Sequence, residues 1–217
     1  MMSYADLERE IDRGTRPELL RGWVLNVLDD VAEGRRPLLA VRHPLGFTCL
    51  PVERTGPDGI CVHAWPADPP TVRPTTSAMH SHSWDLLSHV LHGQVRNELI
   101  EVTDTPVDPA WRVYEVHSRG DVDEMAATDR LVTAATATVE SHSAGASYAL
   151  RAGGFHTSEV GRGQPAVTVA LGRTTPGASD LSLGAVNGRS HRIRRNRCDP
   201  AETARVAREI AQLVARG

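Results

Sequence analysis

The sequence contains no lysine, so all 24 of its basic residues are arginines. This absence indicates a compositional bias of the genome rather than a particular chemistry. Cysteine is also scarce: Cys49, Cys61 and Cys198 are an odd number at wide spacings. The sequence therefore indicates neither a disulfide framework nor a cysteine zinc site. A net charge of -3 gives no sign of a broad nucleic-acid footprint.

Long hydrophobic runs are missing as well. The first ten residues, "MMSYADLERE", are charged where a signal peptide would be apolar, and no apolar run reaches membrane-spanning length. We therefore expect a cytoplasmic protein that binds neither membrane nor nucleic acid. At 217 residues, the chain is long enough for one domain of ordinary size with small additions.

Both ends of the chain have helical patterns. Ser3 is a candidate N-cap for a short helix with Asp6 in its first turn, and Thr15 is a candidate cap for a second helix. Near the C-terminus, Asp199 is a candidate cap and Pro200 suits the first helical position. Apolar residues recur on one face of the second and the C-terminal helix: Leu20, Trp23, Val24, Val27, Leu28 and Val31, then Val206, Ile210, Leu213 and Val214.

Between the helices, short apolar runs alternate with clusters of Gly, Pro, Asp and Ser, which is typical of an antiparallel sandwich or barrel. The predicted fold is mainly β, with N-terminal helices and a C-terminal helix. We expect a helical extension over 1–37, a β-barrel over 38–185, and a basic linker with the last helix over 186–217.

Two charged stretches allow a functional and a structural interpretation. The basic run "RSHRIRRNRC" (189–198) is either an anion or nucleic-acid contact or a solvated linker that pairs with acidic residues, and its lack of interleaved aromatics favours the linker. The acidic stretch "DVDEMAATD" (121–129) lacks calcium-loop spacing, which favours a solvated turn.

Four of the ten histidines fall within "MHSHSWDLLSHVLHG" (79–93). If this segment is one strand, His80 and His82 point the same way, about 6.6 Å apart, so their imidazoles can converge on one ion. His89 is then an outward polar residue, and His92 lies near a hairpin mouth. His156, after the Gly-Gly turn of "YALRAGGFHTSEV", offers a third ligand. We interpreted His43, His63, His117, His142 and His191 as structural or exposed.

The same two segments carry a family resemblance. "HSHSWDLLSHVLHGQVRNELIEV" resembles the first motif of the cupin superfamily, and "YALRAGGFHTSEV" resembles the second. The resemblance implies a single jelly-roll barrel. The glutamate ligand usual in cupins would fall at Leu86 or Leu87. A three-histidine site remains, which resembles the cysteine dioxygenase group of thiol dioxygenases over roughly residues 38 to 178.

Several residues of that group are replaced here. Cys49 lies where the resemblance places the arginine that binds the substrate carboxylate, and cysteine cannot replace a bidentate arginine. Arg54 or Arg73 could bind a substrate carboxylate in its place, from a shifted position in the chain. The Ser-x-His-x-Tyr relay of the family matches Thr168, Ala170 and Gly172, and the crosslinked cysteine matches Leu87. The resemblance thus implies a retained metal site with a substrate other than cysteine.

We therefore expect a metal-dependent small-molecule enzyme, most simply a non-haem iron dioxygenase that uses O2. Fe(II) suits this reaction, although the three histidines would also accept Zn, Ni or Cu. Zinc or nickel would indicate a non-redox isomerase or lyase, and a cupin that binds a metal or ligand without turnover is a third alternative. Trp84, Arg54 and Asn97 are the candidate substrate contacts, and no catalytic residue is assigned. The sequence does not exclude a homodimer.

Overall fold

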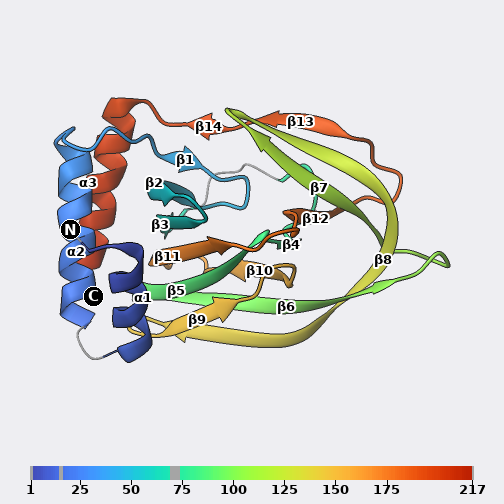
Figure 1. The fold of residues 1–217 in the computed structure, drawn as a ribbon, viewed down its shortest axis with the longest axis horizontal. Helices are drawn as coiled ribbons and strands as arrows, with labels where there is room; N and C mark the ends of the chain where they lie inside the picture. The colour runs from blue at the N-terminus through green and yellow to red at the C-terminus, as the bar shows by residue number, and fades with distance from the viewer. Residues whose placement is uncertain (1, 15–16, 69–73, 217) are drawn as a thin grey trace.

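The structure is a computed structural model that describes residues 2–14, 17–68 and 74–216. Its strands form two antiparallel sheets of seven strands each, with two helices at the N-terminal end and one at the C-terminal end (Figure 1). This antiparallel β-sandwich with helices at both ends of the chain confirms the predicted mainly-β fold class. Thr15 and Arg73, which the sequence analysis had singled out, lie outside the described residues.

Two of the three helices begin directly after the caps that the sequence predicts, Ser3 and Asp199. The three helices are α1 (Tyr4–Arg13), α2 (Pro17–Ala32) and α3 (Pro200–Arg216). Ser3 and Asp6 form a reciprocal capping box at α1. At α3 the carboxylate of Asp199 accepts a hydrogen bond of 2.7 Å from the backbone N–H of Glu202.

The first sheet has the strand order β14-β1-β2-β3-β11-β5-β9. Its strands are β14 (Asn196–Arg197), β1 (Val41–Arg42), β2 (Thr48–Thr55), β3 (Asp58–Trp65), β11 (Ala166–Thr174), β5 (Trp84–His92) and β9 (Ser147–Leu150). The helices cover one face of this sheet, where Leu50, Ile60 and Val169 are buried in one cluster with Val24 of α2 and Ile210 of α3. Burial of these apolar side chains attaches the helices to the sandwich.

The second sheet has the strand order β13-β8-β6-β10-β4-β12-β7. Its strands are β13 (His191–Arg194), β8 (Val122–Ser143), β6 (Gln94–Asp104), β10 (Phe155–Glu159), β4 (His80–Ser81), β12 (Leu181–Gly184) and β7 (Trp111–Arg119). The long strand β8 arches across the molecule (Figure 1) and pairs with β7 through its first half and with β6 through its second half. The strands β10, β4 and β12 lie between β6 and β7, so this sheet curls around its inner face.

The space between the sheets is filled by a second apolar cluster. Leu86 and Val90 of β5, Trp65 of β3, Val95 of β6 and Tyr148 of β9 are all buried in it. Since side chains on a strand alternate between its two faces, the even-numbered residues of β5 from position 84 to position 90 face this interior.

Both charged stretches are strands, which corrects the sequence analysis. The acidic stretch begins β8 rather than forming a solvated turn, and the basic stretch contains β13 and β14 rather than being a plain linker. The expected ion pairing is present. Arg195 lies 2.7 Å from Asp123, and Arg197 lies 2.7 Å from Asp121. The charged stretches therefore pair with each other at one end of the sandwich.

Among the described residues, no helix is both long enough and apolar enough to cross a membrane.

Candidate metal centre

Three histidines from separate parts of the chain meet between the sheets. His80 lies on β4 directly opposite His156 of β10, and His82 follows β4 by one residue. The centroid of the His156 ring lies 4.3 Å from that of His80 and 4.9 Å from that of His82. One ring nitrogen from each residue lies within 4.8 Å of the others, a set that could hold a metal ion.

The chain reaches this geometry by a different route from the predicted one. We expected one strand to run from His80 to His92, but β4 ends at Ser81 and β5 begins at Trp84 in the other sheet. His82 therefore lies where the chain crosses between the two sheets. The two-residue spacing brings His80 and His82 together, with ring centroids 4.9 Å apart, although no continuous strand connects them.

Backbone carbonyls fix the orientation of two of the three rings. His80 Nδ1 lies 2.9 Å from the carbonyl oxygen of Ala78, and His156 Nδ1 lies 3.1 Å from that of Gly154. A neutral imidazole that donates from Nδ1 leaves Nε2 as a lone-pair donor. Both rings are thus held in the tautomer that a metal ion requires at Nε2.

The electrostatics favour neutral imidazoles. Burial, together with the charge of His80, lowers the pKa of His156 from its ordinary value of 6.5 to about 3. Burial also lowers the pKa of His80, and burial with the charges of His80 and His156 lowers that of His82 well below its usual range. Since only a neutral imidazole binds metal, the three side chains are ready to act as ligands at neutral pH.

The third ring, that of His82, stacks against the indole of Trp84. The two rings are stacked, with centroids 4.2 Å apart and planes inclined by 28°. Gly172 of β11 makes room for this indole, because a β-carbon at position 172 would lie 2.7 Å from the Trp84 ring. Trp84 therefore contacts the histidine cluster.

The other two predicted substrate contacts differ in placement. Asn97 of β6 is fully buried on the interior face, where its Oδ1 accepts a 2.8 Å hydrogen bond from Ser158 and its Nδ2 has no partner. Its neighbour Glu98 pairs with Arg96 instead. Arg54 is exposed near the end of β2, so the structure does not group it with the three histidines.

Two further polar side chains lie in the interior: Trp65, which the sequence analysis did not single out, and Thr168, which it noted only as a replaced relay residue. Trp65 Nε1 and Thr168 Oγ1 are buried, and neither has a hydrogen-bond partner. Buried polar groups in native proteins are nearly always satisfied, so such atoms are candidates for contact with a ligand or with water. Their positions on β3 and β11 depend on strand register, which the sequence pattern alone did not reveal.

The remaining histidines of the first motif lie apart from the centre. His92 ends β5 just before the Gly93 turn, as predicted. His89 points away from the interior, but it is 7% exposed rather than solvated, and its Nδ1 lies 2.9 Å from Ser147 Oγ. The expectation of an outward polar residue is wrong in this respect, because α1 and α2 cover this part of the sheet, where Ile11 and Leu20 line a small hollow with His89.

A second group of potential ligands lies on the inner face of the first sheet. Cys49 of β2 and Cys61 and His63 of β3 each place one ligand atom within 4.8 Å of the others. Hydrogen bonds from Cys49 and His63 lower the pKa of the Cys61 thiol well below its usual range. The sequence analysis had found no partners for these residues, and the structure corrects that view.

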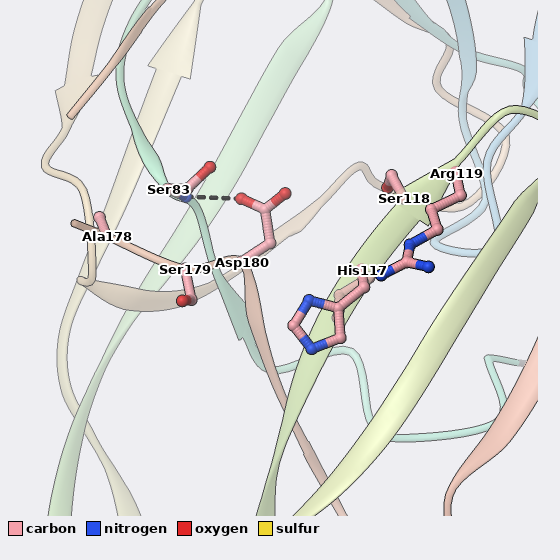
Figure 2. A pocket seen from close by; sticks show the side chains of 8 residues that line it. Ser83, His117, Ser118, Arg119, Ala178, Ser179 and Asp180 are labelled. Atoms are coloured by element: carbon pink, nitrogen blue, oxygen red, sulfur yellow. Dashed lines mark hydrogen bonds between the residues drawn. The ribbon is translucent and has the colours of Figure 1, made fainter. Parts of the chain in front are cut away.

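A shallow pocket of about 330 Å³ opens beside the histidine segment. Figure 2 shows Ser83, which directly follows His82, with its backbone N–H donating a 2.5 Å hydrogen bond to the carboxylate of Asp180. His117 and Arg119 of β7 line the other side of this pocket. The charge of Asp180 opposes the lowering of the His80 pKa.

No protein-family model matches the sequence, and no curated protein matches it. Several solved structures align with part of the chain, and two of them are hydroquinone dioxygenases. One is hydroquinone 1,2-dioxygenase PnpCD in complex with Cd2+ and 4-hydroxybenzonitrile, with 15% identity, a TM-score of 0.32, and coverage of 58% of this chain and 63% of that one. The other is hydroquinone 1,2-dioxygenase from Sphingomonas sp. TTNP3 with 4-hydroxybenzoate bound, with 13% identity, a TM-score of 0.33, and coverage of 57% and 63%. Each alignment spans less than two thirds of the matched protein, and similarity at this level carries no argument about substrate or reaction.

Proposed function

We propose that the protein is a metal-dependent enzyme that acts on a small molecule, with His80, His82 and His156 as the metal ligands. One observation carries this proposal. Two of the three rings donate from Nδ1 to a backbone carbonyl, so their Nε2 atoms are free to bind an ion that His82 can also reach. Such outer hydrogen bonds orient the histidine ligands of metal sites.

The donor set suits Fe(II) and a dioxygenase reaction. Three neutral imidazoles leave the charge of a divalent ion uncompensated, which favours an anionic or electron-rich substrate donor. Bound iron would supply open coordination positions and redox chemistry with O2. Zinc or nickel in the same ligands would support a non-redox reaction instead, whereas copper would keep the site redox-active, and the metal found after anaerobic purification distinguishes these cases.

The surrounding side chains support a substrate other than cysteine. Cys49 lies where the resemblance to thiol dioxygenases places a carboxylate-binding arginine, and the interior offers the neutral donors of Asn97, Trp65 and Thr168. Neutral donors favour an uncharged oxygen or a phenolate oxygen over a carboxylate, which prefers the bidentate contact of an arginine. Trp84 would exclude water beside His82.

The test is metal analysis of the anaerobically purified protein, followed by O2 uptake with iron restored. The substrate panel contains free cysteine, other thiols, amines and phenols. We expect O2 uptake to depend on iron and on His156, and to be at least tenfold slower with cysteine than with the best substrate. His92→Ala is the control, because His92 ends β5 away from the centre. Equal rates in the His156→Ala variant would contradict the proposal, and so would sulfinate formation from cysteine at the highest rate of the panel.

Asn97→Leu tests the substrate contact separately from the metal. Leucine has the same branched shape and the same number of heavy atoms, but it removes the unpaired amide of Asn97. We expect an unchanged metal content and a raised KM for the best substrate, because Asn97 binds the substrate and not the ion. Ser158→Ala, which removes only the hydrogen bond to Asn97 Oδ1, should change KM less. An unchanged KM in Asn97→Leu would exclude Asn97 from substrate binding.

A further inference from the structure

The cluster of Cys49, Cys61 and His63 is separate from the three-histidine centre in both its residues and its strands. Cys49 lies directly opposite His63 in the pairing of β2 with β3, and Cys61 lies opposite Pro51, two residues along the same face. Side chains that are opposite or diagonal on one face of an antiparallel pair can reach each other. The two thiols and the imidazole therefore converge because of strand register.

The spacing of this cluster fits a single ion. Zinc binds sulfur at about 2.3 Å and imidazole nitrogen at about 2.0–2.1 Å, so two ligands on one tetrahedral ion lie roughly 3.4–3.8 Å apart. The three ligand atoms lie within 4.8 Å of one another, so small side-chain movements are enough to close the site. Cys49 and Cys61 are free thiols.

A second observation points to the same place. Thr168 of β11 lies directly opposite His63, and Ala170 lies opposite Cys61. Thr168 is fully buried and its hydroxyl has no hydrogen-bond partner. An unsatisfied hydroxyl next to three potential ligands would have a partner once an ion and its fourth ligand were present.

We propose that Cys49, Cys61 and His63 form a second metal site, which binds zinc. Two thiolates and one imidazole are soft donors that select zinc over iron or magnesium. Three protein ligands leave a fourth tetrahedral position on the interior side, where the Thr168 hydroxyl can hydrogen-bond a bound water or substrate atom. The three ligands of this proposal are independent of the proposed function, since none of them belongs to the first centre; only the Thr168 hydroxyl is shared with the substrate donors named above.

Co2+ is the probe, because thiolate-bound Co2+ has a near-ultraviolet charge-transfer absorption that an all-histidine site lacks. The full-length protein, reduced with a phosphine and kept anaerobic, is titrated with Co2+ and then with Zn2+. We expect the absorption to saturate at one equivalent of cobalt in His82→Ala, where the first centre has lost a ligand, and at no more than two equivalents in the wild type, where both centres take up cobalt. It should disappear when zinc is added.

Cysteine variants identify the ligands. Cys61→Ser and Cys49→Ser should each weaken the absorption at least tenfold, whereas Cys198→Ser should leave it unchanged because Cys198 lies in the helix-side core. His63→Gln provides a third variant and should weaken cobalt affinity while keeping part of the thiolate absorption. Far-ultraviolet circular dichroism confirms folding of each protein. The proposal is overturned if the wild type shows no charge-transfer absorption or if Cys61→Ser retains it in full.

Discussion

At the scale of single residues, the geometry of the histidine centre depends on neighbouring groups that contact the three histidine rings. His80 and His156 are held by carbonyl oxygens two residues before them in the chain, whereas His82 is held by the stacked ring of Trp84. The stack exists because Gly172 has no side chain. The two-residue spacing of His80 and His82 therefore accounts for only part of the geometry.

Gly172→Ala tests this support. A methyl group at position 172 would lie 2.7 Å from the Trp84 ring, so the indole must move and His82 loses its stacking partner. We expect a shifted tryptophan fluorescence spectrum and metal affinity weakened by roughly 10–100-fold, the range found when outer contacts of metal ligands are removed.

Gly59→Ala is the matched control, because Gly59 lies opposite Gly172 on β3 and a β-carbon there would approach no atom closer than 3.8 Å, the distance to Glu53 O. If both variants bind metal equally tightly, Trp84 does not position His82.

Sequence patterns predicted the histidine centre because its ligands belong to two short motifs. They did not predict the cluster of Cys49, Cys61 and His63. Its members converge through the pairing of β2 with β3, which contains an irregularity between Pro51 and Glu53. Strand register is set by tertiary packing and by the turn, so it could not be predicted from the sequence alone.

At the scale of elements, the helices were the most predictable parts of the chain. The capping residues Ser3 and Asp199 and the apolar face of α2 are local signals, and local signals are visible in sequence. The end of β4 at Ser81 was not predicted, because the chain changes sheets there without a glycine or proline to mark the break. The strand pairing of the basic and acidic stretches was also missed, since it joins residues about 70 positions apart.

The turn between β5 and β6 offers a second test. Gly93 has a φ of +76°, and a β-carbon there would lie 2.2 Å from Pro165 O. Gly93→Ala should therefore be destabilised by more than the roughly 1–2 kcal/mol that a left-handed conformation costs.

Gly145, in the turn between β8 and β9, has a φ of +87° with nothing within 4 Å of its β-carbon position. Gly145→Ala should therefore lower the free energy of unfolding only by the roughly 1–2 kcal/mol that a left-handed conformation costs. Urea denaturation measures the free energy of unfolding of both variants. If both are destabilised equally, the clash of the new β-carbon with Pro165 contributes nothing to the loss of stability.

At the scale of the whole molecule, several buried neutral histidines make the metal-free protein sensitive to acid. Burial lowers the pKa of His43 and of His156 from 6.5 to about 3, and it also lowers the pKa of His80, His82 and His89. Between pH 6.5 and 3 these histidines are protonated in the unfolded chain but stay neutral in the folded chain. The free energy of unfolding should therefore be highest above pH 6.5 and fall as the pH decreases.

Urea midpoints of the metal-free protein at pH 8, 6.5 and 5.5 test this dependence. The range from 6.5 to 5.5 isolates the histidines, because the lowered carboxylate pKa values of Asp123 and Glu202 act at lower pH. His156→Gln should show a shallower decline, since one of the responsible groups is gone. A midpoint that stays constant or rises between pH 6.5 and 5.5 would contradict the assignment of these histidines as buried and neutral.

The most direct test of the three-histidine centre is the metal content of single alanine variants. Cys61→Ser serves as the background, so that only the histidine centre is counted, and each protein is loaded anaerobically with Fe(II) and analysed for bound metal. We predict one equivalent for the background and for its His89→Ala and His92→Ala variants, and far less than one for His80→Ala, His82→Ala and His156→Ala. Full metal content in His156→Ala together with loss in His89→Ala or His92→Ala would contradict the account.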